Sequence, residues 1–242
     1  MTVAPTSAHP GGEHRATWFL VAMLAFLIGA VTVAMLYHFD VFAGSSDSTT
    51  HGSGVAATQT RDVPAFKSVE LAGANNVVVR VGGEQSVVVK ADDNLLDRVT
   101  TEVQSGTLVI GNTPGSFSTK SPMSVEVDVP TLNALTLSGS GNIVVTGIEA
   151  ESLDVSLPGS GTLTGRGTAT RLDVNVGGSG MVQFTQLVAQ TVRAAVGGSG
   201  SVFVNATESL DASVSGSGAI IYAGSPRDVT KSITGTGAIT GG

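Results

Sequence analysis

The stretch that decides the fold is LDVSLPGSGTL, residues 153–163. Apolar and polar side chains alternate from Leu153 to Leu157, a Gly-Ser-Gly triplet follows at 159–161, and an apolar residue returns at Leu163. Alternation with a period of two is typical of a β-strand, and a glycine-rich interruption is typical of a tight turn. The stretch therefore predicts a strand, a sharp corner and a second strand.

This unit recurs along the second half of the chain. The triplets begin at Gly139, Gly159, Gly178, Gly198, Gly216 and, with Thr in the middle, Gly235. Their first glycines are 20, 19, 20, 18 and 19 residues apart. The apolar positions six and two residues before a triplet are Leu153 and Leu157, Leu172 and Val176, Val192 and Val196, Leu210 and Val214, and Val229 and Ile233. A single unit is too small to bury these side chains, whereas stacked units align them in columns inside a solenoid.

We therefore predict an all-β fold, a parallel β-helix or β-solenoid with rungs of 18–20 residues. Right-handed winding is the default for parallel crossovers. The chain contains 32 glycines, and we expect the corner glycines to supply positive φ angles, which cost other residues about 1–2 kcal/mol. The middle residues of the triplets should stack into a ladder of hydroxyl groups. A structural role in hydrogen bonding is favoured for this ladder over a polar strip that meets glycans or a partner: Ser140, Ser160, Ser179, Ser199, Ser217 and Thr236.

The chain before the repeats divides into further regions. Residues 16–36 carry no charge and would form a helix about 31 Å long, enough to cross a bilayer. We expect a tail at 1–15, a transmembrane helix at 16–37, a flexible linker at 38–60 and the β-helical domain at 61–242. Arg15 favours an inside N-terminus, and cleavage of a signal peptide after Ala43 is the alternative. Residues 61–137 hold less regular strands and one short helical turn at 93–99, which should cap the first end of the solenoid.

Composition excludes several kinds of site. The chain has no Cys, and all four His residues precede residue 61, which excludes thiolate metal sites and Ser-His or Cys-His nucleophile pairs in the predicted domain. The net charge of −7 argues against nucleic acid as a partner. Val182 and Val202 stand where a calcium-binding glycine repeat would need Asp. We predict no catalytic, cofactor-binding or metal-binding residue and no cofactor.

The predicted domain also carries charged and aromatic residues that are candidates for a site. Asp154, Asp173, Arg193 and Asp211 fall one residue after the outer apolar column, so they should form an exposed charge ladder. Two stacked carboxylates also resemble a glycosidase pair, but a flat exposed face lacks the cleft that such chemistry needs. Asp92, Asp93 and Asp97 are interpreted as a helix start and solvated face rather than a metal site. We expect one aromatic column, formed by Phe184, Phe203 and Tyr222.

Several motifs together resemble a known bacterial family. They are Phe66-Lys67-Ser68-Val69, the strand at 106–110, Val129-Pro130-Thr131-Leu132, the serial Gly-Ser-Gly units and the ending at 221–226. This combination, spread over residues 65–242, resembles the putative auto-transporter adhesin "head GIN domain" family. The resemblance implies a β-helix on the outer side of a membrane and a role in adhesion, and it brings no site residues to this chain.

These observations together predict a single-pass protein of a bacterial cell membrane with its C-terminal domain outside the cytoplasm, in the periplasm or on the cell surface. The predicted function is non-enzymatic: adhesion or interaction with the cell envelope, with a glycan, peptidoglycan or a surface protein as partner and no nucleic acid. Two alternatives stay open. One is a self-assembling structural scaffold, which makes a homo-oligomer, and the other is a polysaccharide-acting β-helix enzyme.

Overall fold

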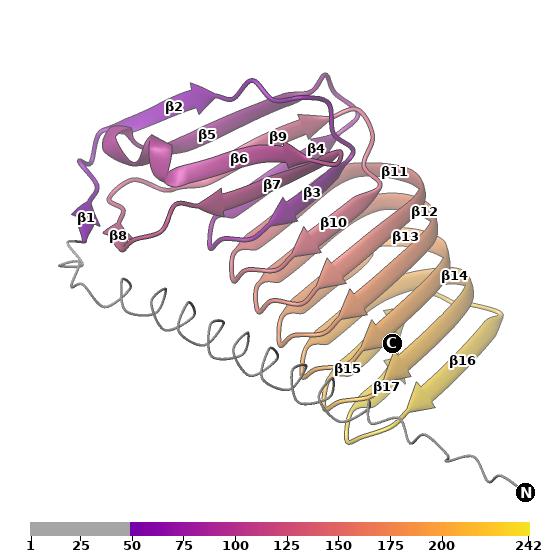
Figure 1. The fold of residues 1–242 in the computed structure, drawn as a ribbon. Helices are drawn as coiled ribbons and strands as arrows, with labels where there is room; N and C mark the ends of the chain where they lie inside the picture. Colours follow the sequence, from indigo (N-terminus) through magenta and orange to yellow (C-terminus); the bar gives the residue numbers. More distant parts are fainter. Residues whose placement is uncertain (1–48) are drawn as a thin grey trace, which may run out of the picture. The chain divides into compact units, whose positions relative to one another are not determined.

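Parallel strands stacked turn upon turn make up most of the protein in the computed structural model, which describes residues 49–242 (Figure 1). Four long strands each run through most of one turn: β11 (Asn142–Leu157), β12 (Thr162–Val176), β13 (Met181–Val196) and β14 (Ser201–Val214). The last turn consists of β15 (Ala219–Ala223), β16 (Asp228–Ile233) and β17 (Ala238–Gly241). The predicted all-β solenoid is confirmed, with about five turns.

The turns build two facing sheets. Sheet I contains β3 (Ser68–Leu71), β10 (Ala134–Leu137), the second halves of β11–β14, and β16. Sheet II contains β9 (Ser124–Val129), β4 (Asn76–Val81), the first halves of β11–β14, β15 and β17. The triplets form the corner from sheet I to sheet II, and a bend inside each long strand leads back. Shifts in register between neighbouring long strands fall at this bend and not in sheet I.

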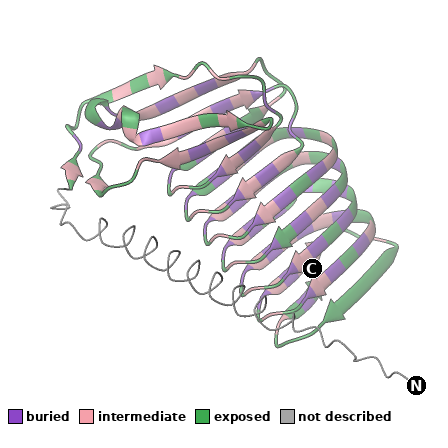
Figure 2. Cartoon of the chain, viewed as in Figure 1, coloured by how far each residue is buried: buried purple, intermediate pink, exposed green. Residues whose placement is uncertain are grey.

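The apolar columns predicted from the repeat form the core. Leu153 pairs with Leu172, then Val192 and Leu210 follow in register, and all four are buried. Figure 2 shows the resulting alternation of buried and exposed positions along the long strands. The last turn differs, because Val229 and Ile233 continue the columns in register but are 40% and 49% exposed. Within the described residues, no further strand packs on β16.

The reason for the corner glycines differs from our prediction. Among the triplet glycines only Gly235 has a positive φ. The other corners need glycine because successive turns touch there: a Cβ atom on Gly161 would overlap the carbonyl oxygen of Gly141 and lie 2.9 Å from Leu137 Cδ2. Positive φ occurs at the opposite bend instead, at Gly147 and Gly167. Close contact between stacked backbones, and not the φ angle, therefore selects glycine at the corners.

Antiparallel strands cap the first end. β5 (Ser86–Asp92) pairs with β9, β2 (Ala56–Thr60) pairs with β5, and β6 (Val99–Gln104) pairs with β7 (Thr107–Asn112), which adjoins β3. The predicted helical turn is the 3-10 helix η2 (Asp93–Arg98), whose Leu95 is fully buried. A two-stranded ribbon of β1 (Thr50–His51) and β8 (Phe117–Ser118) adjoins the cap.

The ordered domain therefore starts earlier than the predicted boundary at residue 61. β1 and β2 fall within the range 38–60 that we expected to be a linker, and they are ordered because they pair with β8 and β5. The predicted tail, transmembrane helix and first part of the linker lie outside the described residues. Among residues 49–242, no helix has the length and apolar character needed to span a bilayer.

The prediction of a single aromatic column is wrong for Phe203. Phe184 is fully buried and Tyr222 lies half-buried in the same inward column, with Val204 between them in register. Phe203 instead aligns with Gln183 and Ile221 on the outer side of sheet II. It stands one residue closer to its triplet than the other two aromatics do, and in a strand one residue reverses the side.

Two glycines at consecutive corners should respond differently to substitution by alanine. Gly161→Ala should lower the free energy of unfolding by about 2–3 kcal/mol, because the new methyl group forces stacked backbones apart. Gly177→Ala should change it by less than about 0.5 kcal/mol, because no atom lies within 4 Å of the added Cβ and its φ is not in the left-handed region. Denaturant unfolding of the 49–242 fragment measures both. Equal effects would contradict the explanation.

Candidate functional site

The outer face of sheet I carries the charged ladder predicted from the sequence. Asp154, Asp173, Arg193 and Asp211 pair in register on successive turns. Arg193 Nε lies 3.5 Å from Asp211 Oδ2, and these side chains are 72% and 55% exposed. Among the described residues, Arg193 forms no corresponding ion pair with Asp173. An exposed pair of this kind adds at most about 1 kcal/mol to stability. The stability of the fold therefore depends little on the ladder.

Two more columns run beside the ladder. Two residues toward the bend lie Ser152, Arg171, Thr191, Ser209 and Asp228. Two residues toward the corner lie Thr136, Ser156, Asn175, Ala195 and Ser213. These columns are not among the predicted site residues, although the same repeat spacing identifies them. Most of their side chains are short, so the backbone of sheet I is thinly covered.

Short side chains leave this face hollowed rather than flat, which corrects our expectation. A hollow of about 360 Å³ crosses β10 to β13, and its lining includes Ala134, Ser156 and Ala195 together with Asp154, Asp173 and Arg193. A second hollow of about 230 Å³ continues over β12 to β16 between Arg171, Asp173, Arg193 and Asp211. Asp173 and Arg193 line both hollows, the first on the corner side of the charge ladder and the second on its bend side, and the two hollows together make one polar relief that crosses successive turns. We call it the sheet I groove.

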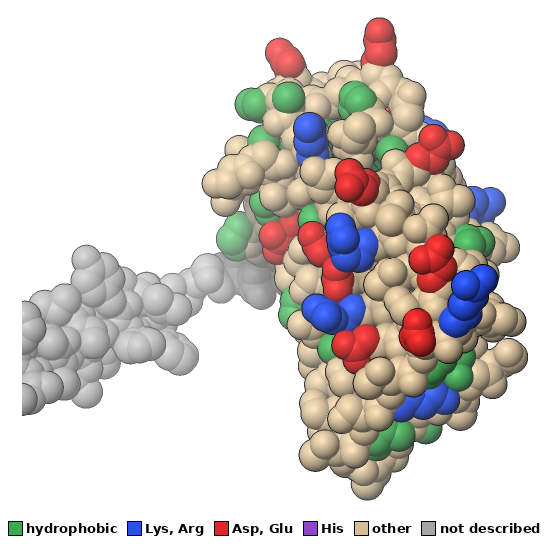
Figure 3. Space-filling view, turned by 90° about the vertical axis from the view of Figure 1, so that its right-hand side faces the viewer, with side chains coloured by type: hydrophobic (Ala, Val, Ile, Leu, Met, Phe, Trp, Pro, Cys, Tyr) green, Lys and Arg blue, Asp and Glu red, His purple; other side chains and the backbone are tan. Residues whose placement is uncertain are grey.

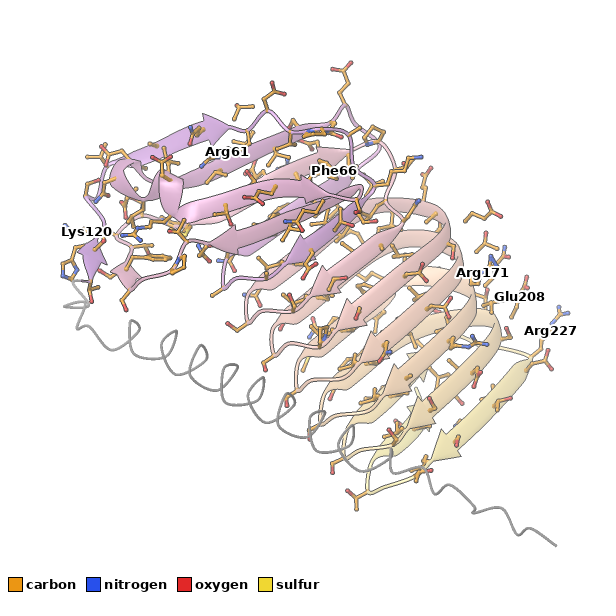
Figure 4. The ribbon with its side chains drawn as sticks, viewed as in Figure 1. Arg61, Phe66, Lys120, Arg171, Glu208 and Arg227 are labelled. Carbon is orange, nitrogen blue, oxygen red and sulfur yellow. The ribbon has the colours of Figure 1, made fainter. Side chains whose placement is uncertain are left out.

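The bends beside the groove carry charges of both signs. In Figure 4, Arg171, Glu208 and Arg227 project from the bend side of the solenoid. Figure 3 faces that side and shows Asp and Glu side chains interspersed with Lys and Arg, with no large area of one sign. A surface of this kind does not present the continuous positive potential that a polyanion requires.

The hydroxyl ladder at the corners is exposed in every turn. The corners are held by their backbones, for example through the Ser160 N–H, which donates to Gly139 O at 3.1 Å. Among the described residues, a hydrogen bond between hydroxyls of successive triplets occurs at one step, where Thr236 Oγ1 lies 3.1 Å from Ser217 Oγ. The expected mutual hydrogen bonding is thus limited to the last step.

The alternatives for metal and acid chemistry can also be placed. Val182 and Val202 are fully buried, so the positions that a calcium-binding repeat would need belong to the core. Within residues 49–242, no three His, Asp or Glu side chains gather closely enough to hold a metal ion. Asp154 and Asp173 do lie side by side on the wall of the sheet I groove, open to solvent.

Asp92 differs from our prediction of a solvated acidic face. It is fully buried in the cap rather than solvated. Its carboxylate accepts hydrogen bonds from the backbone N–H groups of Gly54, Lys120 and Ser121 at 3.0, 2.8 and 3.2 Å. The bond from the Lys120 N–H is the largest cause that lowers the pKa of Asp92 below its usual value of 3.8. A buried carboxylate can mark a functional site, but here it fastens two loops of the cap together.

A second lowered pKa belongs to Glu126 on the outer side of sheet II. Its carboxylate accepts a hydrogen bond from Lys90 Nζ, which is the largest cause of the lowered pKa, and Arg80 Nη2 lies 3.5 Å away. These three side chains come from neighbouring strands β4, β5 and β9 and are partly exposed. They form a surface ion-pair network on the cap, remote from sheet I.

The fold is a β-solenoid with one polar, hollowed sheet. The chain belongs to the family described as "Putative auto-transporter adhesin, head GIN domain", whose model matches residues 65–226. Among curated proteins, none matches the sequence.

Solved structures show the same fold. A putative adhesin from Bacteroides fragilis is 24% identical, with a TM-score of 0.66, covering 79% of this chain and 99% of its own. A putative adhesin from Parabacteroides distasonis is 23% identical, with a TM-score of 0.52 and coverage of 81% and 100%. A putative lipid binding protein from the same organism is 22% identical, with a TM-score of 0.51 and the same coverage. At these identities the likeness concerns the fold.

The role of Asp92 predicts a pH dependence. Its pKa is lower in the folded state, so its contribution to stability is present above the unfolded pKa of about 3.9 and is lost as the pH falls through the folded pKa. Asp92→Asn should lower the melting temperature by several degrees at pH 7, and the difference from wild type should shrink below about pH 4. Thermal melts between pH 2.5 and 7 measure it. Asp93→Asn at the exposed start of η2 is the control, and a difference for Asp92→Asn that does not vary with pH would contradict the assignment.

Proposed function

We propose that this protein is a non-enzymatic binding module, displayed outside the cytoplasm by an N-terminal membrane anchor, that holds a linear glycan along the sheet I groove. The observation that carries the proposal is the groove itself, which crosses successive turns and is lined in each turn by outward side chains of the same columns, most of them polar. Family membership supports a role in adhesion.

The dimensions of the groove suit a polymer. Neighbouring strands in a sheet are about 4.8 Å apart, so binding groups recur at that interval along the solenoid axis. A chain molecule that lies across the turns meets outward side chains at this regular spacing, whereas a compact ligand would meet those of only one or two turns. The repeat of the protein therefore favours a ligand that is itself a repeat.

The side chains in the groove suit hydroxyl groups. Carboxylates at Asp154 and Asp173 accept hydrogen bonds, the Arg171 and Arg193 guanidinium groups donate them, and Asn175 does both. Sugar hydroxyls also both donate and accept, so they can pair with each of these groups. The mixed charge of the groove agrees with a neutral or weakly charged glycan.

Two observations support a role without catalysis. Residues 61–242 contain neither His nor Cys, the side chains most used for general base and thiolate chemistry. The carboxylates of the groove are open to solvent, without the burial that adjusts an acid for catalysis. An anchored, non-catalytic surface fits adhesion or contact with the cell envelope, with peptidoglycan as one natural source of linear glycan.

Binding of the 49–242 fragment to a glycan array and to insoluble peptidoglycan tests the proposal. We expect binding to a linear glycan, and we expect Asp173→Ala with Arg193→Ala to weaken it at least tenfold. Because both side chains are partly or largely exposed, the change in stability should stay within about 1 kcal/mol. Gln183→Ala, an exposed position on the outer side of sheet II, is the matched control and should bind as wild type does.

Failure of the fragment to bind any glycan would reject this ligand class. Binding that Gln183→Ala weakens and the double variant in the groove leaves unchanged would place the binding surface elsewhere.

The display of the domain is tested separately. The uncharged residues 16–36 predict that the full-length chain stays in the membrane fraction after an alkaline wash. A protease added to intact spheroplasts should release a fragment close to residues 49–242, since this unit is compact by itself. Protection of the domain in spheroplasts, with digestion only after lysis, would place it in the cytoplasm and overturn this part of the proposal.

A further inference from the structure

The two ends of the described solenoid expose unpaired strand edges of the same two sheets. At the capped end, sheet I finishes at β6 and sheet II continues through β5 to β2; at the other end they finish at β16 and β17 (Figure 1). An edge strand presents a row of free N–H and C=O groups, on which a strand of another molecule can pair. Each end thus has two edge strands, one from sheet I and one from sheet II. A second copy stacked on either end could therefore extend both sheets.

Exposed apolar side chains gather at these ends. Four large hydrophobic residues of the described chain are exposed, and three of them lie at an end. Val229 and Ile233 point along the core columns from β16 and are 40% and 49% exposed, while Val55 precedes β2 and is 59% exposed. The outer faces of the turns between the ends show one such residue, Val188. Apolar surface that is concentrated in this way marks a contact site.

A lysine lies on the inward side of the β16 end and an acidic hollow at the capped end, while Asp228 lies on the outer side of β16. Lys231 lies in the inward column of β16, in register with buried Ala212, and its Nζ is 4.8 Å from the centre of the Tyr222 ring. At the capped end, a hollow of about 490 Å³ between β2 and β6 is lined by Asp62, Asp97 and Glu102. In the part of the chain that the structure describes, these three carboxylates have no basic partner within ion-pair distance.

The one basic side chain of that hollow is engaged elsewhere. Arg61 Nη2 donates to the carbonyl oxygen of Leu96 at 2.8 Å, and the Val99 carbonyl oxygen lies 3.4 Å away. The guanidinium group therefore ties β2 to η2 and β6. The hollow keeps an acidic character, which complements the lysine at the opposite end.

We propose that copies of this chain associate head to tail, with the β16–β17 end of one copy stacked on the β2–β6 end of the next and Lys231 directed into the acidic hollow. Stacking in this sense continues both sheets from one molecule to the next. The contact joins two different surfaces at opposite ends of the solenoid, so stacking along the solenoid axis leaves both outer ends free and produces rows of molecules. Tail-to-tail pairing would instead bring two Lys231 side chains together. The proposal does not depend on the glycan function.

Sedimentation velocity of the 49–242 fragment over a range of concentrations is the first test, because this unit contains the whole described core. We expect the mean mass to rise with concentration beyond that of a dimer. Lys231→Glu and Asp97→Lys should each weaken association at least tenfold, and the double variant should regain most of it. Arg166→Glu changes the net charge equally at an exposed site on β12, in a middle turn of the solenoid, and should associate as wild type does.

Cross-linking decides the orientation, and the absence of Cys from the sequence makes single thiols unambiguous. Thr230→Cys on β16 and Gln104→Cys on β6 should each stay monomeric with a short bismaleimide and should give dimers when mixed. Dimers from Thr230→Cys alone would show tail-to-tail pairing and overturn the proposal. So would a fragment that stays monomeric at millimolar concentration, or an increase of association in Lys231→Glu, which would assign Lys231 the opposite role of keeping the end free.

Discussion

The whole architecture depends on how closely one turn of backbone can approach the next. Strands in a sheet tolerate side chains because these point above and below the hydrogen bonds, but a corner turns its Cα atoms toward the neighbouring turn. At the first and third positions of the triplets the space for a side chain is absent, and the carbonyl oxygen of one turn occupies the position that a Cβ atom would take. Glycine at the corners therefore lets every strand reach hydrogen-bonding distance of the next. Without that contact, neither the core columns nor the outward columns would align.

This constraint divides the positions of each turn into those that maintain the fold and those that are free to vary. The glycines and the inward aliphatic residues are fixed by stacking, and they leave only the outward positions free to vary. Sheet I uses these positions for short polar and charged side chains, which opens the groove. Sheet II uses some of them for larger residues such as Phe203 and Ile221. The proposed glycan binding therefore uses the relief of a surface, not a pocket closed by loops.

The sequence was sufficient for the solenoid, the triplet corners and the register of the charge ladder, since each follows from a spacing that repeats. It was insufficient where the repeat does not apply. The antiparallel cap unites β2, β5 and β6 through contacts between segments distant in the chain, so the polar run before residue 61 resembled a linker and Asp92 resembled a surface residue. The groove was missed for a different reason. It is a space left by small side chains such as Ala134 and Ala195. The repeat predicts which residues face outward, but it does not predict the shape of the surface that they form.

The bend in each long strand has a further consequence. Register between turns is lost and regained there, between Val145 and Ile148, between Thr164 and Arg166, and between Gln183 and Val188. Turns of unequal length can thus stack while the corners and sheet I stay aligned. The bend is consequently where evolution can insert or delete residues at little cost to the core. Because Arg171 and Glu208 stand beside the bend, longer bends would change the charged edge of the solenoid and leave the scaffold unchanged.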